Sequence, residues 1–103
     1  MNAALKIELE SRRAELAEIC ARLGVRRLEL FGSGTRSAAP RDLDFLVDLG
    51  DRPPGEYAAA YFELRERLEA LFERSVDLVT PPGLGNRYFR ERVEQEKTLL
   101  YAA

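Results

Sequence analysis

The stretch "DLDFLVDL" (42–49) constrains the fold of this chain more than any other. Apolar and acidic residues alternate in it, and a period of two is typical of a β-strand with one buried face. Leu43 and Phe45 would then face the core, while Asp42 and Asp44 would share the opposite face, about 7 Å apart along the strand. An ionised carboxylate in an apolar setting is very costly unless it is paired or binds a metal. The pattern therefore predicts a strand whose second face carries carboxylates that are paired or bind a metal.

Length and charge narrow the class of protein. The chain has 103 residues, enough for one compact domain with a modest core, and we expect a single domain over 1–103. Its 16 basic and 18 acidic residues give a formal net charge of −2. Proteins that bind nucleic acid by bulk electrostatics usually carry a basic face, so we expect no direct nucleic-acid contact.

The expected location is cytoplasmic, without membrane contact. No apolar run approaches the roughly 20 residues that span a bilayer, and the N-terminal "MNAALKIELESRR" has charges where a signal peptide needs its apolar region. The single cysteine cannot form an internal disulfide, which favours a reducing compartment.

The chain contains no histidine. This excludes Ser-His-Asp and Cys-His catalysis, as well as zinc sites that use histidine. Any chemistry must then use carboxylates, hydroxyls, arginines, backbone amides and a hard metal ion.

Helix and strand patterns follow one another along the chain. We expect, in order, a helix over 3–23, a strand over 25–31, the strand over 42–49, a helix over 55–73, a strand over 75–80, a short helix over 86–96 and a strand over 98–102. This order predicts an α/β fold, with a small mixed β-sheet and helices mainly on one face.

A third acid follows the first two. Asp77 lies in a predicted strand between Val76 and Leu78, and it would stand across from Asp42 and Asp44 if the two strands are neighbours. Three carboxylates on one sheet face repel one another unless a cation neutralises them. Mg²⁺ suits such a site, because it commonly takes one or two carboxylates together with substrate phosphates. Each acid alone would more often be a solvated surface residue, so the hypothesis of a metal site rests on the three acids occurring together.

A Gly/Ser turn, "FGSGTRS", directly follows the first predicted strand. Gly32 and Gly34 permit a close backbone approach, Ser33 offers a hydroxyl group, and Arg36 carries a positive charge. Successive amides in such a turn form an anion-binding concavity, which suits phosphates. The turn is neither a Walker A loop nor a dinucleotide-binding fingerprint, because neither spacing is present.

Taken in order, Gly32-Ser33, Asp42-Leu43-Asp44 and Asp77 resemble the signature of the DNA polymerase beta nucleotidyltransferase superfamily. The short length and the ending "NRYFRERVEQEKTLLYAA" more narrowly resemble the minimal nucleotidyltransferase (MNT) family, the antitoxins of HEPN–MNT toxin–antitoxin pairs. The resemblance implies the polymerase-beta-like nucleotidyltransferase fold. It also implies a protein adenylyltransferase that neutralises a HEPN ribonuclease toxin by Mg²⁺-dependent transfer of AMP from ATP to a toxin tyrosine (AMPylation), within a hetero-oligomer.

The resemblance also implies a role for each residue of the signature. The implied catalytic and metal-binding residues are Asp42, Asp44 and Asp77. The implied nucleotide-binding residues are Gly32, Ser33 and Arg36. In this scheme Asp77 also acts as the base toward the attacking hydroxyl group.

Two alternatives stay open. Ser37 stands where the family pattern has its second glycine, and the stretch from Gly32 to Asp42 is a couple of residues short. The first alternative is therefore a catalytically inert MNT-like antitoxin that masks its toxin by steric binding. The second is nucleotidyl transfer to a small molecule, which would need a larger substrate cleft.

Overall fold

The structure is a computed structural model that describes residues 3–31, 41–80 and 97–103. Its elements are α1 (Ala3–Ser11), α2 (Arg13–Leu23), β1 (Arg27–Phe31), β2 (Asp42–Asp48), α3 (Pro54–Phe72), β3 (Ser75–Val79) and β4 (Thr98–Ala102). The four strands and α3 begin and end within two residues of the predicted bounds. The helix predicted over 86–96 lies outside the described residues.

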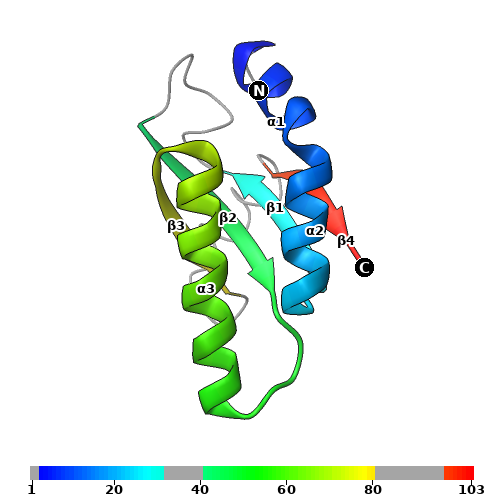
Figure 1. The fold of residues 1–103 in the computed structure, drawn as a ribbon, viewed down its shortest axis with the longest axis vertical. Helices are drawn as coiled ribbons and strands as arrows, with labels where there is room; N and C mark the ends of the chain where they lie inside the picture. The colour runs from blue at the N-terminus through cyan, green and yellow to red at the C-terminus, as the bar shows by residue number, and fades with distance from the viewer. Residues whose placement is uncertain (1–2, 32–40, 81–96) are drawn as a thin grey trace.

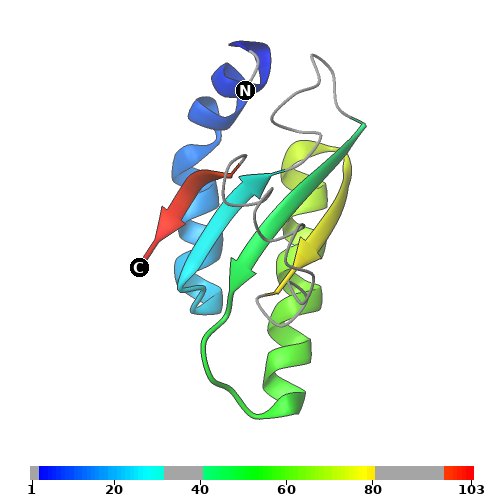
Figure 2. The same cartoon turned by 180° about the vertical axis from the view of Figure 1, so that it is seen from behind.

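The four strands form one mixed sheet in the order β3-β2-β1-β4. β1 is antiparallel to both β2 and β4, whereas β2 and β3 are parallel and are connected through α3. Figure 1 shows α2 and α3 side by side on one face of the sheet, and Figure 2 shows the strands from behind, with β4 and β3 at the two edges. The predicted α/β sheet with helices on one face is confirmed.

The core lies between this face and the helices. Alternate residues of the strands point into it because side chains on a strand alternate between faces. Phe45 of β2 stacks on Phe72 of α3, with ring centroids 6.1 Å apart. The principal buried contributors are Leu5, Leu9, Leu16, Cys20, Leu28, Leu30, Leu43, Phe45, Val47, Leu64, Leu68, Phe72, Val76 and Leu78. The core thus fixes which face of each strand is turned away from the helices.

The helix predicted over 3–23 is in fact two helices, which meet at Arg12. Arg12 has φ −102° and ψ 2°, outside the helical region. Ser11 Oγ donates a hydrogen bond to the Glu8 carbonyl at 2.8 Å, and side-chain bonds of this kind compete with helix geometry. Both residues at the junction, Arg12 and Arg13, are exposed, so no core contact holds it straight. The prediction of one continuous helix was wrong here.

Two side chains tie the helices to the sheet and its loops. Arg52, in the loop before α3, donates hydrogen bonds to the carbonyls of Leu23, Gly24 and Leu49 at 2.6 to 2.8 Å. The Tyr61 hydroxyl of α3 donates to the Leu78 carbonyl of β3 at 2.8 Å.

Within the described ranges, no helix is long and apolar enough to cross a membrane.

Candidate functional site

Strand β2 presents its two aspartates on the face of the sheet opposite the helices. Leu43 and Phe45 are fully buried on the helix side, as the alternation predicts. Asp42 is exposed and Asp44 is half-buried on the other side. We call this second side the acidic face and define it by Asp42, Asp44 and Asp77.

Strand β3 brings the third aspartate beside the second. In the parallel pairing of β2 and β3, Asp44 is the partner of Asp77, and Asp42 is the partner of Ser75. Val76 and Leu78 are buried on the helix side, so Asp77, which is exposed, lies on the acidic face. Neighbouring strands are about 4.8 Å apart, and residues two apart on one strand are about 7 Å apart. The expectation that these two strands are neighbours is confirmed.

The donor set of the acidic face suits a hard divalent cation. All three side chains offer carboxylate oxygens, the ligands that Mg²⁺ prefers. No group of three or more His, Cys, Asp or Glu side chains in the described part of the chain is close enough to hold a metal. The register pair Asp44 and Asp77 still supplies two carboxylates, and one or two are sufficient for Mg²⁺ when substrate phosphates provide other ligands. The residues therefore fit a magnesium–nucleotide site.

The predicted nucleotide-binding residues Gly32, Ser33 and Arg36 lie outside the described residues. Phe31 and Arg41 are the described residues on either side of this stretch. Phe31, the last residue of β1, is the register partner of Asp44, and Arg41 directly precedes Asp42. Both described residues are therefore neighbours of the carboxylates.

Glu29, which the sequence analysis did not single out, lies in β1 between the core residues Leu28 and Leu30. It is 4% exposed and is the one buried charged residue in the described ranges. Its carboxylate contacts two cations: Arg27 Nε lies 3.1 Å from Oε1, and Lys97 Nζ lies 3.4 Å from Oε2. Strand alternation places Glu29 on the same face as Phe31, but no local signal indicates that it is buried or which cations it meets.

The remaining acid of β2 has a structural contact. Asp48 Oδ1 accepts a hydrogen bond from the Gly50 backbone N–H at 2.8 Å and so stabilises the turn that ends the strand. Gly50 has φ 69°, a conformation that favours glycine. Asp48 lies at the opposite end of β2 from Asp42, and we assign it to the turn rather than to the site.

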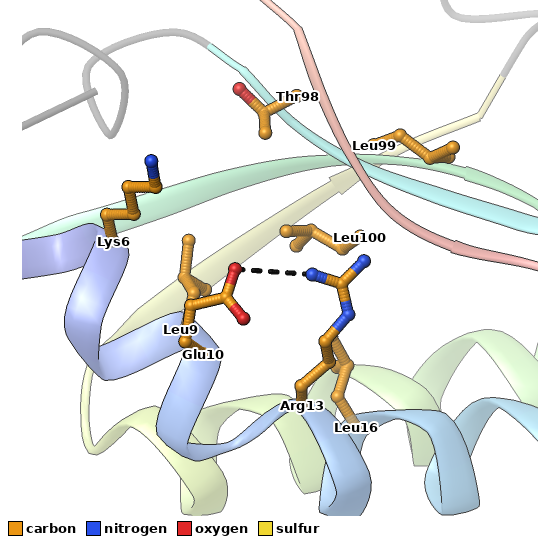
Figure 3. A pocket seen from close by; sticks show the side chains of 8 residues that line it. All are labelled: Lys6, Leu9, Glu10, Arg13, Leu16, Thr98, Leu99 and Leu100. Atoms are coloured by element: carbon orange, nitrogen blue, oxygen red, sulfur yellow. Dashed lines mark hydrogen bonds and ion pairs between the residues drawn. The ribbon is translucent and has the colours of Figure 1, made fainter.

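A pocket of about 320 Å³ lies between α1, α2 and β4. Figure 3 shows its lining side chains, including the Glu10–Arg13 ion pair of 3.3 Å. Thr98 and Leu100 contribute to it from β4, two strands away from β2. Its lining includes the core residues Leu9 and Leu16, which places it on the helix side of the sheet. The pocket is therefore separate from the acidic face.

Comparisons with known proteins identify the family of this chain. The family model of the nucleotidyltransferase domain matches residues 13–100. The protein adenylyltransferase MntA of Thermococcus cleftensis is 40% identical over 73 residues, which make up 69% of this chain and 71% of the relative. A solved minimal nucleotidyltransferase structure is 34% identical, with a TM-score of 0.68 and coverage of 91% of this chain and 93% of that chain.

More distant structures share the fold alone. A tri-AMPylated Shewanella oneidensis HEPN toxin in complex with an MNT antitoxin matches with a TM-score of 0.63 at 18% identity, covering 92% of this chain and 73% of that chain. A toxin–antitoxin complex with AMP-PNP matches with a TM-score of 0.64 at 20% identity, covering 88% and 73%. The fold predicted from the resemblance is confirmed, and the chain belongs to the nucleotidyltransferase domain family as a minimal nucleotidyltransferase.

Proposed function

We propose that this protein is an MNT-type antitoxin that neutralises a HEPN ribonuclease toxin by transferring AMP from ATP to a tyrosine hydroxyl of the toxin, with Mg²⁺ as cofactor. The observation that carries the proposal is the register pairing of Asp44 with Asp77, with Asp42 two residues along the same face. Clustered like charges are unfavourable in the absence of a cation, so three aspartates on one face favour a site that binds one.

The relatives support the partner and the donor. MntA is named a protein adenylyltransferase, and one structural neighbour is an MNT antitoxin bound to an AMPylated HEPN toxin. Another neighbour is a toxin–antitoxin complex with the ATP analogue AMP-PNP. Together with the family membership, these similarities favour ATP as donor and a protein as acceptor.

In the proposed mechanism, the register pair Asp44 and Asp77 would hold the metal against the acidic face, with Asp42 as a further ligand. Bound Mg²⁺ supplies neutralisation of phosphate charge and a template for in-line displacement. Asp77 is on the edge strand β3 and exposed, so an incoming hydroxyl group can reach it. It accepts the hydroxyl proton while the tyrosine oxygen bonds to the α-phosphorus of ATP.

The bond between the α-phosphorus and the oxygen bridging to the β-phosphate then breaks, and pyrophosphate leaves. The products are AMP-tyrosine and pyrophosphate. The Gly/Ser stretch with Gly32, Ser33 and Arg36 would bind the phosphates, since the described residues before and after it, Phe31 and Arg41, are neighbours of the carboxylates. Positioning and charge neutralisation can account for most of the catalysis in this reaction, without a histidine.

The test is label transfer from ATP labelled at the α-phosphate to the purified HEPN partner, with Mg²⁺ present. Wild type should label the partner, and the double variant Asp42→Asn with Asp44→Asn should not. Asp51→Asn is the matched control, because Asp51 is an exposed acid in the loop just after β2 and should leave labelling unchanged. Chelation of divalent ions should abolish labelling.

The inert alternative makes the opposite prediction. A steric antitoxin would still protect against the toxin when Asp42 and Asp44 are both asparagine. An unlabelled partner with wild type, or full protection by the double variant, would overturn the enzymatic proposal. This alternative is tested because Ser37 stands where the family pattern has its second glycine.

A further inference from the structure

Lys97 lies at the same end of the sheet as the carboxylates. Thr98, the first residue of β4, pairs with Leu30 of β1. Continuing this antiparallel register by one residue places Lys97 beside Phe31, whose partner on the other side is Asp44. Asp44 in turn pairs with Asp77. One row across the sheet therefore runs from Asp77 through Asp44 and Phe31 to Lys97, although Lys97 is far from the other three in the sequence.

The side chain of Lys97 lies on the acidic face. Thr98 is the register partner of Leu30, whose side chain is buried on the helix side, so the residue before Thr98 faces the other way. The contact between Lys97 Nζ and the buried Glu29 carboxylate, at 3.4 Å, agrees with this orientation. Lys97 itself is only partly exposed, with 23% of its side chain accessible.

Two cations, Arg27 and Lys97, contact the single carboxylate of Glu29. Arg27 pairs with Asp48 and Ala102, at the end of the sheet remote from Asp44. Of these two cations, Lys97 is the one at the carboxylate end of the sheet, in register beside Phe31. An ammonium group has three N–H donors and can contact both a carboxylate and a phosphate.

We propose that Lys97 is an additional nucleotide-binding residue, which contacts the phosphates of the bound ATP from the β4 side of the acidic face. This rests on the function proposed above. Lys97 lies two strands from Asp44 in this row, about 10 Å away, and its long side chain shortens the distance that a triphosphate must span. Lysine commonly binds phosphate as a point charge.

The experiment measures the affinity of the full-length protein for AMP-PNP with Mg²⁺ by titration calorimetry. Lys97→Met should weaken binding by about tenfold, the order expected for one lost charge-assisted hydrogen bond. Lys97→Arg keeps the charge and should stay within about threefold of wild type. Arg27→Met is the matched control: it removes the other cation on Glu29 and should change the affinity by less than about twofold.

A second variant and a second readout separate binding from folding. Lys97→Gln keeps a donor toward Glu29 and should show the same loss as Lys97→Met, which covers the case in which methionine is not accommodated. In label-transfer kinetics, KM for ATP should rise with kcat nearly unchanged, because the contact is made in both the bound state and the transition state.

The outcomes distinguish this inference from the function on which it rests. If wild type binds AMP-PNP and labels the partner, but Lys97→Met and Lys97→Gln bind as tightly as Arg27→Met, then the role of Lys97 is wrong and the proposed function stands. If wild type neither binds AMP-PNP nor labels the partner, then both are wrong. Selective weakening in the Lys97 variants supports the proposal.

Discussion

Asp44 of β2 and Asp77 of β3 are register partners in a parallel strand pair, on the side of the sheet that faces away from the helices. Because strands in a sheet are only about 4.8 Å apart, two ionised carboxylates in this position repel each other. The pairing of two like charges therefore has a cost in stability, which nearby cations offset. The effect of these charges on the free energy of unfolding and their effect on activity can be measured separately.

Removing the charge of Asp77 should raise stability and abolish activity. Asp77→Asn relieves the repulsion with Asp44, and because Asp77 is exposed we expect the free energy of unfolding to rise by only a few tenths of a kcal/mol, roughly. Denaturant unfolding in the presence of a chelator measures this change. Label transfer should fall at least about a hundredfold, because the proposed base is lost. A stability below that of wild type would contradict the repulsion argument.

Arg52 should be important for the connection between α2 and the β2–α3 loop. Its guanidinium group donates to the carbonyls of Leu23, Gly24 and Leu49, so Arg52→Ala leaves the C-terminus of α2 without these donors. We expect a loss of about 2 kcal/mol in the free energy of unfolding. Arg67→Ala is the control, since its exposed pair with Glu63 at 3.4 Å should contribute less than about 0.5 kcal/mol. Equal losses in the two variants would show that the Arg52 hydrogen bonds contribute no more to stability than an exposed ion pair.

Tyr61 should contribute through its hydroxyl group as well as its ring. Tyr61→Phe removes the hydrogen bond to the Leu78 carbonyl and keeps the apolar contacts with the core. The expected loss is about 1 kcal/mol in the free energy of unfolding, measured by denaturant titration. Leu78 directly follows Asp77, so the same variant tests whether anchoring α3 on β3 affects the site. We expect label transfer to stay within about threefold of wild type, because the strand register is held by its own ladder.

Cys20 should be unreactive in the folded protein. Burial raises the pKa of its thiol from 9.0 to about 12, so the group stays neutral and inaccessible in the native state. A thiol reagent at about pH 8 should modify it only as the chain unfolds. Rapid modification of the native protein would contradict this.

The same shift sets a dependence of stability on pH. The unfolded thiol loses its proton near its ordinary pKa of 9.0, while the folded thiol keeps it until about 12. The folded state therefore binds more protons in this window, and the Cys20 contribution to stability, complete below pH 9.0, falls as pH rises. The slope is at most about 1.4 kcal/mol per pH unit. Comparison of the free energies of unfolding of wild type and Cys20→Ala between about pH 8 and about pH 10.5 separates the Cys20 contribution from those of the other ionisable groups.

The sequence alone determined which residues lie on each face of the strands. The alternation in "DLDFLVDL" places Asp42 and Asp44 opposite Leu43 and Phe45, because the two-residue period is a property of the strand backbone itself. The ranges of α3 and β3 follow equally from local periodicity and from the prolines and glycines around them. The family also follows from the order of short motifs. The roles of Gly32, Ser33, Arg36 and the three aspartates remain predictions.

The tertiary structure alone decided which strands are neighbours. Every strand edge presents the same N–H and C=O groups, so the local pattern cannot choose a partner. The partners depend on which apolar faces bury together against the helices, and this places Asp77 beside Asp44. The same packing brings Lys97 to the buried Glu29 from the other end of the chain. That contact depends on long-range packing that no local window of the sequence contains.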